Sequence, residues 1–328
     1  EKDIAANFSV NASITKLAIK KDGARLTEAQ FSFCPNLKSV EISAKNVKLD
    51  CMAFTGCLKL KDAILSGGLS DASDLTAAFA YCITLENVTL TNDLKNLGQS
   101  MFTECASLKT ISVPDGVESL VGSFVSCASL ESVHIGAKVK DMGIDNGEFY
   151  GCDSIKTVTV SSDNESFSTV DGINIYDKSG KKLVYCMVGG DSLVIPEGVE
   201  EIDPKAMGIV CPYLSVSIPS TLKTLDQDTF TTAVKLAEII NKSKFNIGTQ
   251  VSGEYRSFAV SVHSGDESKI KTVNGFKFIT GDDGINYLID SGSGREVVLP
   301  EDYNGENYRV TIGAFFCNAS ITSLVVSD

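Results

Sequence analysis

The chain of 328 residues has no tryptophan and only two histidines, His134 and His263. It has no uninterrupted apolar run of about 18 residues, so we expect no transmembrane segment. Metalloprotease, phosphate-loop and dinucleotide-binding motifs are missing, as is any C-x-x-C pair of the kind that binds zinc. These absences remove the recognised signatures of several enzyme classes, and we expect neither a cofactor nor a metal.

The balance of charge bears on the choice of partner. There are 42 acidic and 29 basic residues, which gives a formal net charge of -13. Such a chain repels phosphate backbones, so we expect no nucleic acid partner. The acidic surplus by itself indicates colloidal solubility, and no block of like charge indicates an interaction tail.

A five-position apolar pattern recurs through the first half of the chain: Phe, then a small residue three positions on, then aliphatic residues after three, three and two more. The copies are Phe8, Asn11, Ile14, Leu17, Ile19; Phe31, Cys34, Leu37, Val40, Ile42; Phe54, Cys57, Leu60, Ala63, Leu65; Phe79, Cys82, Leu85, Val88, Leu90; Phe102, Cys105, Leu108, Ile111, Val113; Phe124, Cys127, Leu130, Val133, Ile135; and Phe149, Cys152, Ile155, Val158, Val160. The small-residue position recurs in steps of 23, 23, 25, 23, 22 and 25 residues. A period in this range indicates a solenoid.

The end of each copy alternates apolar and polar residues, as at 39–43, 110–113 and 157–160. This alternation predicts a short strand with one buried face, and successive copies predict parallel pairing. The Phe and the small residue before the cysteine position predict one helical or 3₁₀ turn. A single copy cannot offset the conformational entropy of its own ordering, since five buried anchors contribute only about 1.5–3 kcal/mol each. The copies must therefore stack.

Ten cysteines would ordinarily suggest a disulfide framework, but most of them occupy one position of the repeat. The residues in that position are Asn11, Cys34, Cys57, Cys82, Cys105, Cys127, Cys152, Cys211, Ala233 and Asn318. Because Asn and Ala cannot form a bridge, the position requires a small side chain beside a turn, and we expect free buried thiols. Stacked turns lie roughly 5 Å apart, which leaves disulfides as the alternative. Cys51 and Cys186 lie outside the position and are the expected reactive pair.

The regular pattern ends near Ser161. Two inserts are each predicted to form a β-hairpin, with turns at 177–180 and 281–284. Degenerate copies of the repeat lie between them. We therefore predict one continuous solenoid domain. Its segments are regular repeats at 1–165, a hairpin insert and re-entry at 166–205, degenerate repeats at 206–245, a second insert at 246–292 and a C-terminal repeat at 293–328.

Residues 101–114, together with Val194-Ile195-Pro196 and Val298-Leu299-Pro300, resemble the BspA-like bacterial leucine-rich repeat family. The resemblance covers nearly the whole chain, although 240–270 fits less well. It implies an α/β, β-rich, right-handed solenoid with a parallel sheet and hairpin inserts. It also implies a secreted or surface protein of host-associated bacteria, which binds proteins or mediates adhesion and has no catalytic residues.

The chain starts at Glu1 without an apolar leader, so we expect a mature form from which a targeting segment was removed. We expect an extracellular or cell-surface location, with a lipid anchor in the removed segment as one option. The last strand pattern stops two residues before Asp328, and we expect truncation or a partner at this sheet edge. Oligomeric state stays open.

The outward positions of the strands are the expected binding surface, with the inserts as the other candidate. The candidate residues are Glu41, Asp62, Thr89, Ser112, His134, Thr159, Tyr303 and Tyr308. The expected partner is an extracellular protein or a glycan. Since the sheet face carries no aromatic residue, a structural spacer without a ligand is the alternative. A hydrolase built on Ser112, His134 and Thr159 is a weaker hypothesis, because no strained nucleophile turn is visible.

Overall fold

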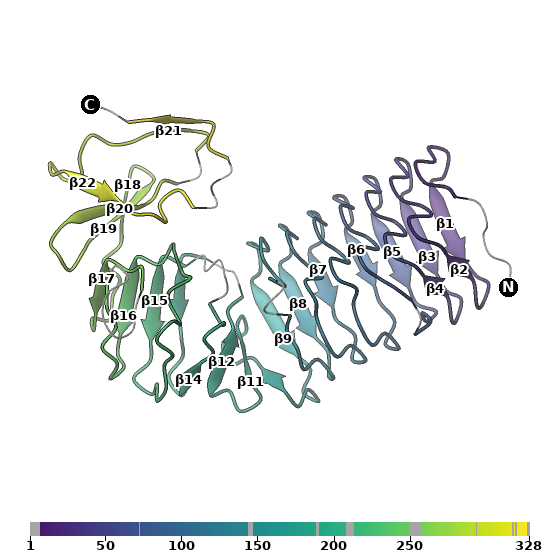
Figure 1. The fold of residues 1–328 in the computed structure, drawn as a ribbon, viewed down its shortest axis with the longest axis horizontal. Helices are drawn as coiled ribbons and strands as arrows, with labels where there is room; N and C mark the ends of the chain where they lie inside the picture. Colours follow the sequence, from purple (N-terminus) through teal and green to yellow (C-terminus); the bar gives the residue numbers. More distant parts are fainter. Residues whose placement is uncertain are drawn as a thin grey trace. The chain divides into compact units, whose positions relative to one another are not determined.

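A computed structural model describes residues 7–71, 73–143, 147–187, 190–207, 213–249, 257–292, 294–316, 318 and 320–326. The chain forms two compact units (Figure 1). Unit 1 comprises Glu1–Gly180 and Tyr185–Gly189, and unit 2 comprises Lys181–Val184 and Gly190–Asp328. Each unit is described by itself below. The predicted division of one solenoid into five segments stays a prediction.

Short parallel strands recur once per repeat in unit 1, because β-branched and aliphatic residues alternate there with polar ones. The first sheet has the order β1-β3-β5-β6 and the second the order β7-β8-β9. The strands of these sheets are β1 (Lys16–Ile19), β3 (Ser39–Ile42), β5 (Asp62–Leu65), β6 (Asn87–Thr89), β7 (Thr110–Ser112), β8 (Ser132–Ile135) and β9 (Thr157–Val160). Successive register partners are Leu17, Val40, Ala63 and Val88 in the first sheet, and Ile111, Val133 and Val158 in the second. The predicted parallel rungs are confirmed within each sheet.

The two sheets of unit 1 meet at β6 and β7, which lie next to each other but belong to separate sheets. On the turn side of the same coils the backbone bonding is continuous. Phe79 N donates to Met101 O at 2.9 Å, and Tyr81 N donates to Thr103 O at 2.7 Å. The coils therefore remain joined through their turns where the strand ladder is interrupted.

A column of phenylalanine rings forms the core of unit 1. Each ring stacks on the ring one copy away, with centroid distances of 5.2 to 5.9 Å and interplanar angles of 19° or less. The rings are Phe8, Phe31, Phe54, Phe79, Phe102, Phe124 and Phe149. Tyr185 closes the column edge-on against Phe149 at 6.2 Å. Each such pair contributes about 0.5–1.5 kcal/mol beyond the burial of its area.

The cysteines form a second column beside the rings. Each thiol donates to the backbone carbonyl of the Phe in the preceding copy, at 2.9 to 3.3 Å. All six thiols, from Cys34 to Cys152, are fully buried, and the eight described cysteines are free. Asn318 makes the matching contact through Nδ2 to Gly292 O at 2.6 Å. A small buried side chain beside a turn backbone is therefore confirmed at this position, and Cys211 lies outside the described residues.

The cysteines predicted to be reactive do not have the surroundings of a reactive thiol. Cys186 is buried. Burial raises the pKa of Cys51, and the nearby carboxylates of Glu28 and Asp74 raise it further. A raised pKa lowers the fraction of thiolate, which is the reactive form. The structure therefore gives no support to a reactive role for this pair.

The helical part of the predicted α/β class is not confirmed, because the described residues form strands and turns and no helix. The predicted helical turn around each ring from Phe31 to Phe149 contains two residues with positive φ, four positions apart. Ala29 (51°) and Phe33 (52°) form one such pair, and Ala77 (51°) and Tyr81 (60°) another. A right-handed helix cannot pass through left-handed residues, so each turn closes without helix. The fold is a parallel-sheet solenoid of leucine-rich repeat type, and its right-handedness stays a prediction.

Unit 1 has a narrower opposite wall and ends in its own insert. The wall contains β2 (Arg25–Leu26) paired in parallel with β4 (Lys48–Leu49), and the Arg25–Asp50 ion pair of 2.9 Å lies beside it. In the insert, β10 (Phe167–Ser168) pairs antiparallel with β11 (Ile175–Asp177). Gly180 N then donates to Asp177 O at 2.9 Å, which closes a turn at the predicted place.

Unit 2 begins with a short parallel pair and contains three further groups of strands. The pair joins Lys182 and Leu183 of β12 (Lys182–Tyr185, of which Tyr185 belongs to unit 1) to β14 (Glu201–Ile202). The parallel sheet β13-β15-β16-β17 consists of β13 (Ser192–Val194), β15 (Ser215–Ile218), β16 (Glu238–Asn241) and β17 (Ser261–His263). The sheet β18-β19-β20-β22 consists of β18 (Lys271–Val273), β19 (Phe276–Thr280), β20 (Asn286–Asp290) and β22 (Tyr308–Val310). The last pair is β21 (Glu296–Val298) with β23 (Ser323–Val325).

The second insert forms the predicted hairpin. Strands β19 and β20 pair antiparallel across the turn at 281–284, where Gly284 N donates to Gly281 O at 3.0 Å. One side of this hairpin contributes Ile279, Tyr287 and Ile289 to a core with Ala237 and Val260. The hairpin is therefore packed on the coils that carry β16 and β17.

Candidate functional site

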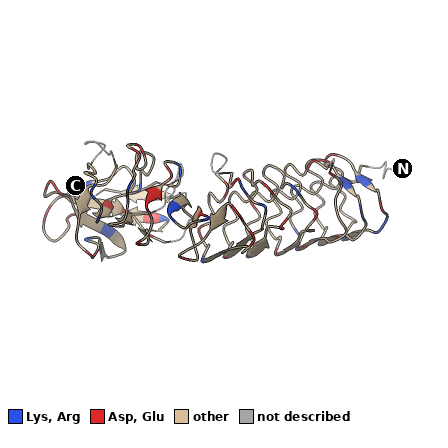
Figure 2. Cartoon of the chain, turned by 90° about the horizontal axis from the view of Figure 1, so that it is seen from below, with Lys and Arg blue, Asp and Glu red and all other residues tan. Residues whose placement is uncertain are grey.

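The outward face of the unit 1 sheets contains the six strand residues predicted as binding candidates. They lie in two rows that run across the strands, and every residue of both rows is exposed or half-buried. The flanking row is Lys16, Ser39, Asp62, Asn87, Thr110, Ser132 and Thr157, and the central row is Ala18, Glu41, Ile64, Thr89, Ser112, His134 and Thr159. Figure 2 shows Lys and Arg interspersed with Asp and Glu along the chain. We call these two rows together the bare face. Half of its side chains carry hydroxyl groups, and it contains both acidic and basic residues.

Two polar pairs lie on this face. Asn87 Nδ2 donates to Asp62 Oδ1 at 2.7 Å. His134 Nδ1 lies 2.9 Å from Thr159 Oγ1, with Ser112 as its register neighbour on the other side. Within the described residues, His134 has no carboxylate partner that could orient it as a base. The face therefore carries groups suited to hydrogen bonding and lacks an assembled catalytic set.

The two tyrosines predicted as binding residues belong to the core of unit 2. Tyr303 is 8% exposed and stacks on Phe278 with centroids 4.4 Å apart. Tyr308 meets the same ring edge-on at 5.3 Å, and its hydroxyl donates to Pro300 O at 2.6 Å. Their rings and the Tyr308 hydroxyl are used within the chain, so they present little to a ligand.

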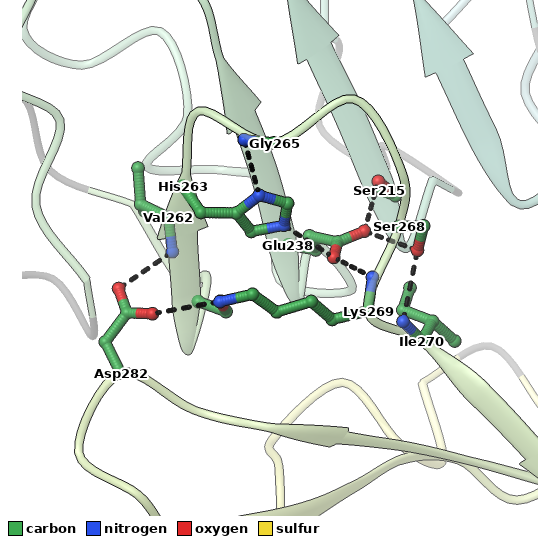
Figure 3. Close-up of polar contacts among 10 residues, drawn as sticks. Ser215, Glu238, Val262, His263, Gly265, Ser268, Lys269, Ile270 and Asp282 are labelled. Atoms are coloured by element: carbon green, nitrogen blue, oxygen red, sulfur yellow. Dashed lines mark hydrogen bonds and ion pairs between the residues drawn. The ribbon is translucent and has the colours of Figure 1, made fainter.

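The equivalent face of the unit 2 sheet is covered over β15, β16 and β17, while Ser192 and Val194 of β13 are exposed. Its flanking row, in register, is Ser192, Ser215, Glu238 and Ser261, and its central row is Val194, Ser217, Ile240 and His263. Ser215 is 3% exposed, while Glu238 and Ser261 are fully buried. The cover is the segment that leaves β17 and returns toward β18, residues 264–270 (Figure 3).

The Glu238 carboxylate fixes this cover. Its Oε2 accepts from the hydroxyls of Ser215 at 2.7 Å and Ser268 at 2.6 Å. Its Oε1 accepts from Lys269 N at 2.6 Å and lies 3.0 Å from His263 Nε2 (Figure 3). Burial acts to raise the pKa of Glu238, but the hydrogen bonds outweigh it and hold the pKa below its usual value. The residue is therefore a buried carboxylate with four donors.

A Glu, a His and two Ser side chains in one cluster could suggest a hydrolase, but the bonding pattern argues against it. Gly265 N donates to His263 Nδ1 at 3.1 Å, so Nδ1 is an acceptor and Nε2 carries the proton that Glu238 receives. Both hydroxyls donate to the carboxylate and neither contacts the imidazole. No nitrogen is left to take a proton from a nucleophile, and the cluster holds a loop in place.

Unit 1 has its own buried carboxylate, Glu148, directly before the last ring of the Phe column. It accepts from the backbone N–H groups of Gly122 and Ser123. Burial raises the pKa of Glu148 to about 8, against the lowering effect of these N–H groups, and Asp141 adds to the rise. The pKa values of two buried acids of this chain are thus shifted in opposite directions. Among the described residues no group of three His, Cys, Asp or Glu side chains could hold a metal ion.

The family assignment follows from the repeat. The family model described as "BspA type leucine rich repeat region" matches residues 2–121, 75–170 and 181–254 of the chain, with six copies. The chain belongs to the BspA type leucine-rich repeat family. The search of curated proteins gave no match. The resemblance drawn from the Phe-Cys-Leu pattern is thereby confirmed.

Several solved structures of bacterial leucine-rich repeat proteins are similar to this chain. One from Eubacterium ventriosum ATCC 27560 is 18% identical, with 88% of this chain and 73% of that chain covered and a TM-score of 0.48. A leucine rich cell surface protein from Faecalibacterium prausnitzii A2-165 is 17% identical, with 100% and 90% covered and a TM-score of 0.39. One from Bacteroides ovatus ATCC 8483 is 18% identical, with 72% and 81% covered and a TM-score of 0.35. These likenesses carry no weight in the functional argument, which rests on the chain's own geometry.

Sequence patterns did not point to Glu238 or to its cover. The stretch 240–270, which fits the repeat least well, supplies the covering segment. One signal was available: Glu238 precedes two aliphatic residues at the position where neighbouring strands have Ser. Among the described residues, no helix is long and apolar enough to cross a membrane.

Proposed function

We propose that this BspA type repeat protein binds an extracellular macromolecule, in the first place a protein, through the outward face of the unit 1 sheets, and catalyses no reaction. The observation that carries the proposal is the contrast between two like faces. The flanking row of the unit 2 face is buried over β15, β16 and β17, where residues 264–270 lie on it, while the unit 1 rows stay exposed or half-buried along seven strands. An uncovered regular sheet face on a stacked scaffold is the surface that solenoid proteins use for recognition.

The histidine surroundings support the non-catalytic part of the proposal. His134 pairs with a threonine hydroxyl, and both nitrogens of His263 are used within the cover. Family membership supports a secreted or cell-surface location, where a protein or glycan partner would be met.

A second candidate function is a spacer that holds other parts of a protein away from a surface. The bare face favours it in one respect, because neither row contains an aromatic residue or an arginine. Protein interfaces usually draw most of their binding energy from Trp, Tyr and Arg. A spacer would have the same fold and no ligand.

The test is an array of purified extracellular matrix proteins and glycans, probed with the wild-type chain and two variants. The double variant Thr89→Arg/Ser112→Arg places bulk on the bare face, and Ala128→Arg places the same side chain on an exposed turn. Saturable binding to an array protein that the double variant loses and Ala128→Arg keeps supports the proposal. Binding that survives the double variant, or no binding by a folded chain, contradicts it, and the second result favours the spacer. Binding confined to glycans contradicts the choice of a protein partner.

A further inference from the structure

The bare face of unit 1 and the covered face of unit 2 carry the same outward pattern over three adjacent strands. In both sheets a serine, an acidic residue and a polar residue follow one another across the flanking row, with an isoleucine beside the acid in the central row. The residues are Ser39, Asp62, Asn87 and Ile64 on β3-β5-β6, and Ser215, Glu238, Ser261 and Ile240 on β15-β16-β17. The two faces thus match at these four positions, and they differ beside the isoleucine, where unit 1 has Glu41 and Thr89 and unit 2 has Ser217 and His263.

In unit 2 the chain itself shows what this pattern binds. Ser268 donates its hydroxyl to the Glu238 carboxylate, and Lys269 donates its backbone N–H to the same group. The Lys269 ammonium donates to Ser261 Oγ at 3.2 Å, and Ile270 packs against the core that the β19-β20 hairpin forms with Ala237 and Val260. A hydroxyl residue and a basic residue in succession therefore bind the row, and the aliphatic residue after them packs on the neighbouring hairpin.

In unit 1 the corresponding groups have room for such a segment. Asp62 is half-buried and accepts one hydrogen bond from Asn87, where Glu238 has four donors. A carboxylate can accept several bonds, so Asp62 retains acceptor capacity toward solvent. Ile64 is 40% exposed. Glu238 is covered by residues 264–270, whereas no segment of unit 1 is seen to donate to Asp62 apart from Asn87 among the described residues.

The negative charge of this part of the face favours a segment that carries a basic residue. Glu41 lies beside Ile64 in the central row, so this part of the face holds two carboxylates, with Lys16 as the basic residue at its edge. A basic side chain on the occupant would therefore be attracted to this face, as the Lys269 ammonium in unit 2 lies 4.0 Å from the Asp282 carboxylate.

We propose that the β3-β5-β6 face is a docking site for an extended peptide segment of a partner protein that carries a hydroxyl, a basic and an aliphatic residue in succession, as Ser268-Lys269-Ile270 does in unit 2. This inference rests on the proposed function and names the chemistry of its partner. The docked segment donates its hydroxyl and backbone N–H to Asp62, directs its cation to Glu41 and Asn87, and packs its aliphatic side chain on Ile64.

The experiment uses an end-blocked peptide of residues 267–272, Glu-Ser-Lys-Ile-Lys-Thr, titrated with the full chain and followed by peptide-observed NMR. The wild-type chain is expected to bind it saturably. Asp62→Asn, which keeps the shape of the side chain, weakens binding by about tenfold or more, since hydrogen bonds to a charged group are lost. Asp153→Asn removes an equal charge from an exposed turn and leaves binding unchanged.

Substitutions in the peptide test the same hydrogen bond as Asp62→Asn does in the protein. The change Ser268→Ala in the peptide weakens binding to the wild-type chain and has little further effect on Asp62→Asn, because both changes remove the same bond. A scrambled peptide of equal composition does not bind. Far-ultraviolet circular dichroism verifies that each protein variant is folded.

Three results would overturn the inference: no saturable binding up to millimolar concentrations, equal binding to wild type and Asp62→Asn, or binding that depends on Glu238 instead of Asp62. Self-association of the chain that Asp62→Asn abolishes would also overturn it, since the occupant would then be a second copy. The proposed function is judged separately, because array binding lost in Thr89→Arg/Ser112→Arg stands whether or not this peptide binds.

Discussion

The sheet faces of the two units differ in their cover far more than in their composition. In unit 1 the acid of the flanking row, Asp62, is half-buried and contacts one neighbour. In unit 2 the acid in the same register, Glu238, is fully buried and has four donors. The same row can thus serve as an exposed surface or as the inside of a packed unit, and the deciding element is one short segment, residues 264–270.

Removing the two acids is expected to separate the faces most clearly. Glu238→Ala leaves several buried donors without an acceptor and lowers the free energy of unfolding by about 3–5 kcal/mol. The Asp62 side chain is half-buried and reaches solvent, so Asp62→Ala should change the free energy of unfolding by only about 0.5 kcal/mol. Hydrogen exchange of β16 and β5 measures each effect locally, without assuming a single unfolding transition. Equal costs at the two positions would mean that the faces do not differ in the way described.

The buried Glu148 is expected to make unit 1 sensitive to alkaline pH. Its pKa is raised to about 8 in the folded chain, above the usual 4.5, so its contribution to stability is fully present below pH 4.5 and is lost as the pH rises through about 8. The loss is on the order of 3–5 kcal/mol. Denaturation of wild type and Glu148→Gln between pH 5 and 9 measures it, and the variant should show a flatter profile over this range. A wild-type profile as flat as that of the variant would contradict the assignment.

Loss of one donor from the cover is expected to cost less. Ser268→Ala removes one hydroxyl from the Glu238 carboxylate and lowers the free energy of unfolding by about 1–2 kcal/mol. The control is Thr159→Ala on the bare face, where the partner His134 can bond to water instead, and a change of about 0.5 kcal/mol or less is expected. Proteolytic susceptibility of the 264–270 segment should rise in Ser268→Ala only.

The smallest effect is expected at acid pH in unit 2. The pKa of Glu238 is lowered by its donors, so its contribution to stability is present above the ordinary pKa of a glutamate and is lost as the pH falls through the lowered value. The population of open, exchange-competent β16 should increase in the wild type as the pH falls below the ordinary pKa of a glutamate, measured as a loss of amide protection relative to the intrinsic exchange rate at each pH. Glu238→Gln should be less stable at neutral pH and lack this acid-dependent increase. An acid response that persists in Glu238→Gln would place its origin in another group.

Much of the fold could be predicted because each copy repeats the same local requirements. The Phe, Cys and aliphatic positions gave the in-register rungs, and the substitution of Asn and Ala in the Cys position indicated that no bridge is needed there. Three features could not be predicted in this way. The left-handed residues such as Phe33 and Tyr81, which exclude the helical turn, are not marked by glycine. The separation of β6 from β7 has no counterpart in the repeat spacing. The packing of Tyr303 and Tyr308 depends on Phe278, more than twenty residues away in the chain.

Periodicity by itself determined the stacking of this chain, because a coil of about 23 residues cannot bury its apolar positions without its neighbours on both sides. It also determined which side chains face outward, since strand alternation is a local property. Only the tertiary structure decided which outward rows are covered. Whether a row is covered depends on whether a segment some 30 residues further along the chain returns and donates hydrogen bonds to an acid such as Glu238. The repeat pattern does not predict such a contact, because the covering segment lies outside the repeat.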